Sequence, residues 1–499
     1  MDSPHVVIVG AGPGGCLTAI NFAQRGWKTT LIERGRDFSQ VDLTVNKSWM
    51  IGLSNKGIGA INRVPGLWEA IKPCTLENKG AIFNVGGKLM KTENPEKTQS
   101  YIVDRNYVTG ALLKFLVKHH GSDPKLKCLF QTTLLYVDGQ NKTITVRSPA
   151  SPANELSYDL LIGADGVRSV VRNSLFSQHR DFACSNASLF GLSKSLYLDH
   201  QPEGYDPKYF YMMPGALKNL TAVALCGPQK TLNMAFGLPD HLPADKEILS
   251  SDPEVVFKYF RKNFKPWSVN MQFCREFCKA RWYSIGQVKC NVYHMGVTDG
   301  TALLLGDAAH ATSPALGMGM NTALWDAQVL DELMDELKES LEAVLPAYSE
   351  ARVKEGRSLT DLSFNSYHVV PERNLWGLFK NFVRQFLNRI TGGWVNRPGL
   401  MALGDEGRDA ISNAFKLCSS QGTLDKNRAQ NDAFIREHFE RTVGMRPHTK
   451  TSLLAHQQRQ ALLGLGGTAD IGTLKLTELK EFKQINKEEM KKAMPEPSE

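Results

Sequence analysis

Features that mark membrane-spanning or secreted chains are missing from this sequence of 499 residues. It contains no run of about 18 apolar residues, the length that crosses a bilayer. Its first residues lead into an apolar segment without the charged region of a secretory signal. Its nine cysteines are irregularly spaced, which argues against a disulfide framework and favours a reducing compartment. We therefore expect a cytoplasmic protein with no transmembrane helix.

A strong charge of one sign is also missing, because the net charge of +8 is spread over the whole chain. So diffuse a charge gives no reason to expect nucleic-acid binding. Cys274 and Cys278 lie four residues apart without a second cysteine or histidine pair nearby, so we expect no metal site. With 42% hydrophobic residues, the composition is that of an ordinary globular protein. The length suggests roughly two to four structural units.

The N-terminal segment follows the order strand, glycine-rich turn, helix, strand. An apolar run ends at residue 9, and Gly10, Gly12 and Gly15 then match G-x-G-x-x-G at the start of a helical pattern. In this motif the first glycine allows a tight turn, the second lets a pyrophosphate approach the backbone, and the third lets the helix pack on the strand. The helix N-terminus attracts the phosphates. The pattern predicts a dinucleotide site; the alternative is a glycine-rich structural turn.

The second strand of this unit ends at Glu33. A carboxylate at this point is placed to accept hydrogen bonds from an adenosine ribose. Arg34 follows it and either contacts the adenosine or is solvated.

Two later segments repeat the pattern of a strand followed by a turn and a helix. The first, at residues 158–169, carries Asp165-Gly166 after an apolar run. The second, at residues 301–310, ends in Gly306-Asp307-Ala308-Ala309-His310. The glycine-rich stretch 313–321 follows it and opens a long helix from about Thr322.

Together these three motifs resemble those of the FAD-dependent aromatic hydroxylases, the class A flavoprotein monooxygenases, over about residues 5–420. The resemblance implies an α/β fold, with a Rossmann-like FAD-binding domain, an antiparallel β-sheet substrate domain and a C-terminal helical region. The expected units are a discontinuous FAD-binding domain (1–75, 100–183 and 290–330), a substrate-domain sheet (76–99 and 184–289), a helical region (331–420) and a tail with an amphipathic helix (421–499).

The resemblance also assigns residues to the cofactor. Asp307 is expected to accept a hydrogen bond from the flavin ribityl chain, and the 317–321 loop to donate N–H groups to the flavin ring. The implied FAD contacts outside the first motif are Arg105, Leu134, Asp165, Gly306, Asp307, Gly317, Gly319, Met320 and Asn321. Pro314 is expected to face the ring where oxygen reacts. His310 is a candidate catalytic residue, although an isolated histidine in such a turn is more often structural.

Within the family, the segment at 47–57 is similar to that of the kynurenine 3-monooxygenases. The substrate contacts match less well. The position of a carboxylate-binding arginine falls at Lys79 or Gly80, depending on one gap, and that of a tyrosine falls near Glu93. An asparagine position falls at Ser366, next to Asn365. Lysine does not replace a bidentate arginine, and a glutamate repels a substrate carboxylate. We therefore expect a related hydroxylase with a different substrate.

The resemblance implies a single-component monooxygenase. NAD(P)H would act as a transient reductant of FAD, and O2 would form a flavin hydroperoxide that hydroxylates a small, aromatic molecule. Two alternatives remain open: an FAD-dependent epoxidase, oxidase or reductase of the same fold, and a flavoprotein that acts on a protein partner through its tail. For the helical pattern at 477–493, a solvated helix and peripheral docking to a membrane surface are both considered.

Overall fold

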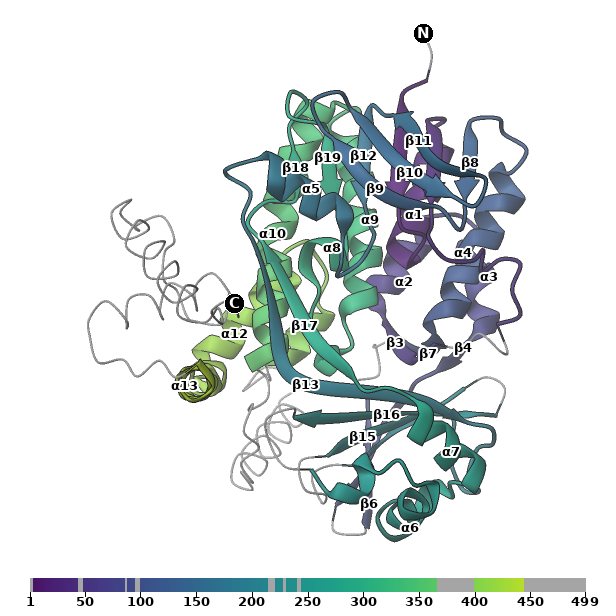
Figure 1. Ribbon diagram of the computed structural model, residues 1–499, viewed down its shortest axis with the longest axis vertical. Helices are drawn as coiled ribbons and strands as arrows, with labels where there is room; N and C mark the ends of the chain where they lie inside the picture. The colour runs from purple at the N-terminus through teal and green to yellow at the C-terminus, as the bar shows by residue number, and fades with distance from the viewer. Residues whose placement is uncertain are drawn as a thin grey trace, which may run out of the picture.

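The computed structural model describes residues 3–43, 48–85, 88–94, 99–213, 220–227, 230–239, 244–365 and 399–443. Two large sheets dominate it, one in the upper and one in the lower part of Figure 1. The upper sheet has six strands, all parallel to their neighbours except β18. In spatial order its strands are β18 (His294–Met295), β19 (Ala302–Leu304), β12 (Leu160–Gly163), β1 (His5–Val9), β2 (Lys28–Ile32) and β8 (Leu126–Leu129).

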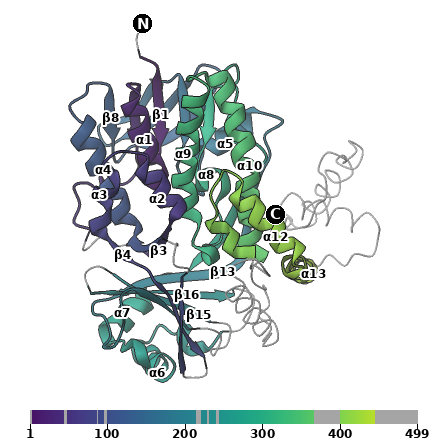
Figure 2. The ribbon, with the colours of Figure 1, turned by 180° about the vertical axis from the view of Figure 1, so that it is seen from behind.

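Apolar strands and helices form the core around this sheet. β1, β12 and β19 are almost wholly buried, as their continuous apolar runs predict. Figure 1 and Figure 2 show helices on both faces. The helices and 3₁₀ turns of the upper part are α1 (Pro13–Gln24), α2 (Asn55–Asn62), α3 (Leu67–Ile71), η1 (Lys72–Cys74), α4 (Arg105–His120), α5 (Val170–Gln178), α8 (Asp307–His310) and η4 (Pro314–Leu316).

The lower sheet has seven strands and is antiparallel except for one parallel pair, β5 with β14. The family resemblance predicted an antiparallel sheet, so this pair is a local departure from it. In spatial order its strands are β17 (Tyr283–Cys290), β13 (Cys184–Leu198), β16 (Leu232–Pro239), β15 (Thr221–Cys226), β14 (Tyr209–Met213), β5 (Gly80–Val85) and β6 (Lys88–Glu93).

A second core of aromatic side chains lies under the lower sheet. Phe236 of β16 packs edge-on against Phe260 of α6 and Phe277 of α7, with ring centroids 5.6 and 5.3 Å away. The helical elements of this part are η2 (Lys246–Leu249), α6 (Pro253–Asn263), η3 (Lys265–Trp267) and α7 (Met271–Lys279).

Two small sheets complete the β-structure. One connects the two large parts, and the other lies beside the upper sheet (Figure 1). The first consists of β3 (Met50–Ser54), β7 (Ser100–Asp104) and β4 (Thr75–Glu77), and the second of β11 (Ser151–Ser157), β10 (Thr143–Ser148) and β9 (Thr133–Asp138).

The first two C-terminal helices lie over the upper sheet, and the last two pack beside the second of them (Figure 2). They comprise α9 (Gly319–Glu336), α10 (Leu341–Asn365), η5 (Gly399–Gly404), α12 (Ala410–Ser420) and α13 (Thr423–Val443). α9 starts at Gly319 rather than near Thr322 as the sequence predicted, because residues 319–321 join the first helical turn. α13 lies in the part predicted to be a tail, yet its Asn427 and Asn431 side chains bond to the end of α10. The amphipathic helix expected at 477–493 lies outside the described residues.

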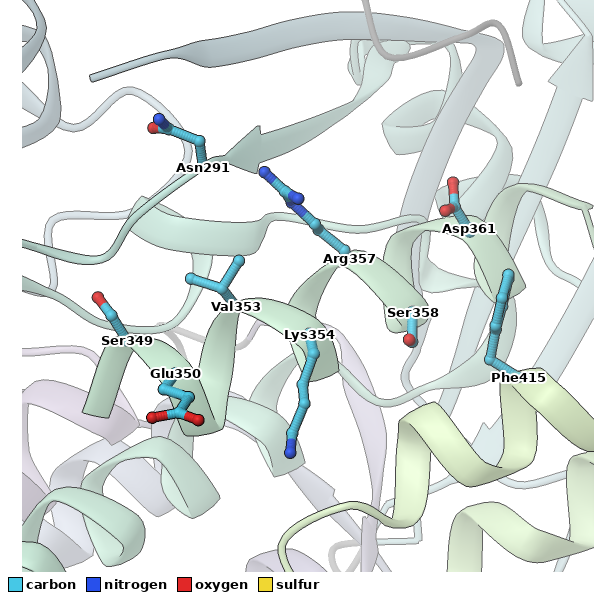
Figure 3. Close-up of a pocket in the computed structure, with 9 residues that line it drawn as sticks. All are labelled: Asn291, Ser349, Glu350, Val353, Lys354, Arg357, Ser358, Asp361 and Phe415. Carbon is cyan, nitrogen blue, oxygen red and sulfur yellow. The ribbon is translucent and has the colours of Figure 1, made fainter. Parts of the chain in front are cut away.

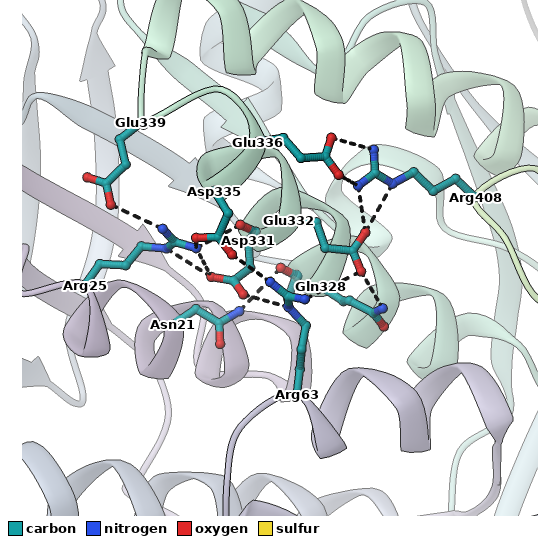
Figure 4. Close-up of polar contacts among 11 residues, drawn as sticks. Asn21, Arg25, Arg63, Gln328, Asp331, Glu332, Asp335, Glu336, Glu339 and Arg408 are labelled. Carbon is teal, nitrogen blue, oxygen red and sulfur yellow. Dashed lines mark hydrogen bonds and ion pairs between the residues drawn. The ribbon is translucent and has the colours of Figure 1, made fainter.

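An acidic face of α9 joins the N-terminal helices to the C-terminal ones. Figure 4 shows the arginines converging on it. Arg25, just after α1, bonds to Asp331 at 2.6 Å, and Arg63, just after α2, bonds to the other oxygen of the same carboxylate at 2.8 Å. Arg408, just before α12, bonds to Glu332 at 2.8 Å. Because each arginine comes from a different segment, this cluster fixes α9 against both ends of the chain.

Candidate functional site

The strand order brings four chain segments to one edge of the upper sheet. β19, β12, β1 and β2 are parallel neighbours, so their C-terminal ends lie at the same edge. Gly10 follows β1, Glu33 follows β2, Asp165 lies two residues after β12, and Gly306 lies two residues after β19. Ligands of open parallel sheets bind outside the carboxyl ends of the strands. The residues predicted from three separate motifs thus meet at one place.

The three glycines of the first turn serve different purposes. Gly10 has φ +104°, and a Cβ there would lie 2.4 Å from the Ala164 oxygen. A Cβ on Gly15 would lie 1.9 Å from the Gly10 oxygen. A Cβ on Gly12, by contrast, would have no atom within 4 Å. Packing therefore requires Gly10 and Gly15, whereas Gly12 leaves its backbone open to a ligand at the start of α1.

Glu33 holds the glycine-rich turn in place. One carboxylate oxygen accepts the Ala11 N–H at 2.8 Å, and the other accepts the Gly35 N–H at 2.7 Å. Each oxygen keeps a second lone pair for a ribose hydroxyl. Arg34 is exposed beside Glu33, and Leu134 is buried in β9.

Asp165 caps the helix that follows it. Its Oδ2 accepts the N–H groups of Val170 and Val171 at 2.7 and 3.2 Å, at the start of α5. Its Oδ1 is buried and has no hydrogen-bond partner among the described residues. Burial raises the pKa of Asp165, although hydrogen bonds from Ser169 and the backbone oppose that shift. The unpartnered oxygen is an acceptor available to a bound group.

Asp307 is the exposed residue of its turn, whereas Ala308, Ala309 and His310 are buried. Gly306 before it adopts φ +61°, which turns the chain from β19 into α8. Desolvation by the surrounding protein raises the pKa of Asp307, against its electrostatic interactions with His310 and Arg105, which lower it.

The loop before α9 is open at its glycines. Pro314 and Gly317 are exposed, Gly317 has φ +63°, and a Cβ there would meet no atom within 4 Å. Met318, which precedes Gly319 and α9, makes no side-chain capping bond in the described structure. The N–H groups of the first turn, including that of half-buried Met320, therefore have no cap to satisfy them.

The Asn321 side chain is committed to the protein rather than available to a flavin. Its amide nitrogen donates to the oxygens of Gly52 and Gly317 at 2.8 and 3.0 Å. Its oxygen accepts the Ser54 N–H at 2.8 Å. The predicted contact by this residue is thus left to its backbone, while the side chain anchors the loop to β3.

Arg105 is the first residue of α4 and is exposed, with its guanidinium 5.9 Å from the Trp49 ring centroid. The residue before it, Asp104, was not predicted and is buried. One Asp104 oxygen caps α4 through the Asn106 N–H at 2.7 Å, and the other accepts the Tyr197 hydroxyl of β13 at 2.5 Å. Asp104 therefore connects the Arg105 turn to the lower sheet.

His310 is part of a buried charged network that sequence reasoning missed. Its Nε2 lies 2.7 Å from Asp326 Oδ2, which also accepts the Gly306 N–H at 2.9 Å. The other Asp326 oxygen accepts Arg352 Nε at 2.6 Å. Burial alone would raise the pKa of Asp326, but His310 and Arg352 hold it below its ordinary value.

This network gives His310 a structural task, and its candidate catalytic role stays a prediction. The ring is 2% exposed and bonded to Asp326, so it supports the Gly306–Asp307 turn from behind. The only sequence signal for Asp326 was a charged residue within an otherwise apolar helix face.

The predicted substrate residues do not gather at one place. Lys79 is exposed just before β5, where the neighbouring Gly80 pairs with Glu93 of β6. Asn365, at the end of α10, is buried, and its side-chain oxygen accepts the amide of Asn431 at 3.2 Å. That bond belongs to the packing of α13 rather than to a ligand site. Ser366 lies outside the described residues.

A pocket of about 530 Å³ lies along α10 (Figure 3). Its walls come from α10, α12 and the turn after β17, and none of its lining residues was predicted to bind cofactor or substrate. Lys354 in this pocket is paired with Asp409 at 2.7 Å. The pocket therefore shares no lining residue with the glycine-rich edge.

The glycine-rich edge fits FAD. The N-termini of α1 and α9 offer N–H groups and partial positive charge to a pyrophosphate and to an anionic ring edge. Gly12 and Gly317 leave open space, Asp307 offers a carboxylate to a hydroxyl, and Asp165 has a free acceptor.

Comparisons with known proteins agree with this site. The chain is 27% identical to a violacein synthase of Chromobacterium violaceum over 381 residues, which cover 74% of this chain and 86% of that protein. It is 29% identical to a kynurenine 3-monooxygenase of Aspergillus candidus over 472 residues, covering 84% and 89%. A Caenorhabditis briggsae kynurenine 3-monooxygenase is 26% identical, covering 78% and 87%.

The fold is similar to that of a solved oxygenase structure. The tetrameric form of 2-methyl-3-hydroxypyridine-5-carboxylic acid oxygenase superposes with a TM-score of 0.60 at 18% identity, over 81% of this chain and 97% of that one. The predicted fold class, with its FAD-binding part, sheet part and C-terminal helices, is thereby confirmed. In the part of the chain that the structure describes, no helix has the length and apolar character that a bilayer requires.

The model of the FAD binding domain matches residues 4–202 and 265–363, which together make up more than half of the chain. This match confirms FAD as the cofactor. The chain belongs to the FAD-binding-domain family of the class A flavoprotein monooxygenases.

Proposed function

We propose that the protein is a single-component monooxygenase that takes electrons from NAD(P)H and transfers one atom of O2 to a small, aromatic substrate. When bound, FAD supplies the oxygen-activating chemistry. The observation that carries the proposal is the meeting of the Gly10, Glu33, Asp165 and Asp307 turns at one sheet edge with two uncapped helix N-termini.

The residues of this edge have separable tasks in the proposal. The first turn of α1 binds the pyrophosphate, while Glu33 fixes the turn that presents it. Asp307 accepts a hydroxyl of the ribityl chain. The N-terminus of α9 would stabilise negative charge on a bound ring, because its uncapped N–H groups are held in a fixed arrangement. Pro314 has no N–H and stiffens the exposed loop beside the ring.

The lower sheet supports a substrate other than kynurenine. The Tyr209 hydroxyl donates to Glu93 at 3.2 Å, and Lys91 lies 4.1 Å from the centroid of the Tyr209 ring. In the β5–β6 register, Glu93 lies opposite Gly80, the residue after Lys79. Glu93 is ion-paired with Lys91 at 3.5 Å, and its carboxylate would repel the carboxylate of an amino-acid substrate that came within reach. We therefore propose a substrate that carries no carboxylate at this end.

The test is substrate-stimulated oxygenation by the purified holoprotein. NADH and NADPH oxidation would be measured with a panel of phenols, anilines and aromatic acids that includes kynurenine, and products would be analysed after reaction under ¹⁸O2. We expect one neutral or amine-bearing aromatic compound to stimulate oxidation and gain one labelled oxygen. Reduction of O2 without labelled product from any compound would contradict the proposal and favour the oxidase alternative.

The Glu93→Gln variant tests the substrate argument separately. Removing this charge is expected to raise kcat/KM for carboxylate-bearing aromatics relative to neutral ones. Lys91→Gln serves as the matched control, because it changes a neighbouring charge of opposite sign and should shift the preference the other way. An unchanged preference in both variants would show that this strand end does not face the substrate.

A further inference from the structure

Two cysteines face each other where β13 and β17 meet. Cys184 is the first residue of β13 and Cys290 is the last of β17, and the antiparallel register pairs them directly. Figure 1 shows these two strands running together from the upper part of the molecule to the lower sheet. The mechanism proposed above uses neither cysteine.

The hydrogen bonds around the pair determine how close the two cysteines lie. The Asn291 N–H donates to the Ala183 oxygen at 3.0 Å, so the adjacent pair is a hydrogen-bonded one. Hydrogen-bonded and non-hydrogen-bonded pairs alternate along antiparallel strands. Cys184 and Cys290 therefore form a non-hydrogen-bonded pair, in which the Cα atoms are about 4.5 Å apart and the side chains lie on one face.

The bonds of β17 on its other side agree with this alternation. The Val288 N–H, two residues before Cys290, points away from β13 and donates to the Ala311 oxygen at 2.8 Å. A Cα separation of about 4.5 Å falls within the range of roughly 4.4–6.8 Å that a disulfide spans. The backbone thus does not have to move far for the sulfurs to bond.

The two thiols are chemically different. A hydrogen bond from Cys290 lowers the pKa of Cys184 to about 7, and the charge of Arg172 acts in the same direction. The same hydrogen bond, followed by burial, raises the pKa of Cys290, against the charges of Arg172 and Arg357. Figure 3 shows Arg357 extending from α10 toward Asn291, the residue after Cys290. Cys184 is half-buried and Cys290 is 1% exposed.

We propose that Cys184 and Cys290 are a peroxide-sensitive modification site, at which hydrogen peroxide converts the two thiols into a reversible disulfide across β13 and β17. The site goes beyond the proposed function, because it requires neither flavin nor substrate. Half-exposed Cys184 is the residue that peroxide reaches, and buried Cys290 is the resolving thiol.

The reaction balances in two steps. The Cys184 thiolate attacks one peroxide oxygen; an S–O bond forms, the O–O bond breaks, and the other oxygen leaves as water after taking a proton. Cys290 then attacks the sulfur of the Cys184 sulfenic acid; the S–S bond forms, and the S–O bond breaks as hydroxide takes the Cys290 proton and leaves as water. Each sulfur loses one electron, and hydrogen peroxide gains two.

The disulfide would brace a strand pair that supports the cofactor turn. Arg172, whose charge acts on both thiols, donates to the Ala308 oxygen of α8 at 3.0 Å. The Val288–Ala311 bond attaches β17 to the chain just beyond α8. The cross-link also closes a long loop, residues 184–290, so we expect the oxidised protein to have the higher melting temperature.

The experiment uses the folded, purified holoprotein. Reduced protein would be exposed to substoichiometric hydrogen peroxide, free thiols would be blocked with N-ethylmaleimide, and peptides would be mapped by mass spectrometry. The expected result is a cross-linked peptide containing Cys184 and Cys290, which dithiothreitol separates, together with a raised melting temperature. In Cys290→Ser, the expected product is a Cys184 sulfenic acid that dimedone traps.

The second cysteine pair of the chain provides the control. Cys274 and Cys278 lie one helical turn apart in α7, and burial raises the pKa of Cys274 to about 12. Cys278→Ser should leave the cross-link unchanged. The proposal is overturned if peroxide oxidises the wild-type Cys184 to sulfinic acid without a cross-link, if Cys274 or Cys278 reacts before Cys184, or if the cross-link forms only in denaturant.

Discussion

The buried network behind the cofactor turn gives a sharp prediction for Asp326→Asn. Asp326 has no exposed surface, and its carboxylate accepts from Gly306, His310 and Arg352. Arg352 is equally buried, and its two terminal nitrogens have no partner among the described residues. Removing the Asp326 charge leaves Arg352 without its ion-pair partner in the interior.

Breaking a buried ion pair from one side costs about 3–5 kcal/mol. Whole domains are stable by about 5–15 kcal/mol, so this loss is a large fraction of the total. We expect Asp326→Asn to lower the free energy of unfolding by about 3–5 kcal/mol, measured by urea denaturation of the apoprotein. FAD retention after desalting should fall as well, because the same carboxylate holds Gly306, the residue before Asp307.

The matched control is Asp335→Asn on the same helix. The Asp335 side chain is 55% exposed and pairs with Arg25 and Arg63, so the loss should stay below about 1 kcal/mol. Adding Arg352→Met to Asp326→Asn should recover part of the stability, since it removes the unpaired charge. Equal, small losses for Asp326→Asn and Asp335→Asn would refute the reasoning.

The pH dependence of stability follows from the lowered pKa of Asp326. A carboxyl with a folded-state pKa below its unfolded value of about 3.9 stabilises the protein above that value. The stabilisation is lost as the pH falls through the folded-state pKa. The decline in wild-type stability below about pH 4 should therefore be shallower in Asp326→Asn.

The remaining predictions concern the turns and the connection between the sheets. Gly15→Ala should destabilise the protein by about 1–3 kcal/mol or more, because the new Cβ would collide with backbone atoms. Gly12→Ala should keep the fold and lose FAD, because its Cβ would meet no protein atom. Equal melting temperatures of the two variants would contradict this. Asp307→Ala should raise the Kd for FAD about tenfold or more, from a lost charged hydrogen bond of roughly 1.5–3 kcal/mol. The pKa of Asp307 is raised in the folded protein, so above that pKa the ionised carboxylate lowers the free energy of unfolding. The Asp307→Ala apoprotein should therefore be no less stable than the wild type at neutral pH. A lower melting temperature of the variant would contradict this. Tyr197→Phe should cost about 1.5–3 kcal/mol in urea unfolding through the lost bond to Asp104, and a neutral result would show that this connection is not needed.

The sequence determined the local units of this protein. Gly10, Gly12 and Gly15 were readable as a phosphate-binding turn because their spacing and their place between a strand and a helix are local properties. The Gly306–Asp307 turn was readable for the same reason, since an apolar run ends directly before it.

Only the tertiary structure decided which side chains remain free for ligands. Asn321 and His310 belong to motifs, yet their side chains bond to β3 and to Asp326. β3 is distant from Asn321 in the sequence, and no pattern in the sequence marks Asp326 as the partner of His310. Asp104 and Asp326 showed no motif, because their partners Tyr197 and Arg352 lie 93 and 26 residues away. The register that pairs Cys184 with Cys290 likewise depends on how β13 and β17 align, since a shift of one residue would place the two thiols on opposite faces.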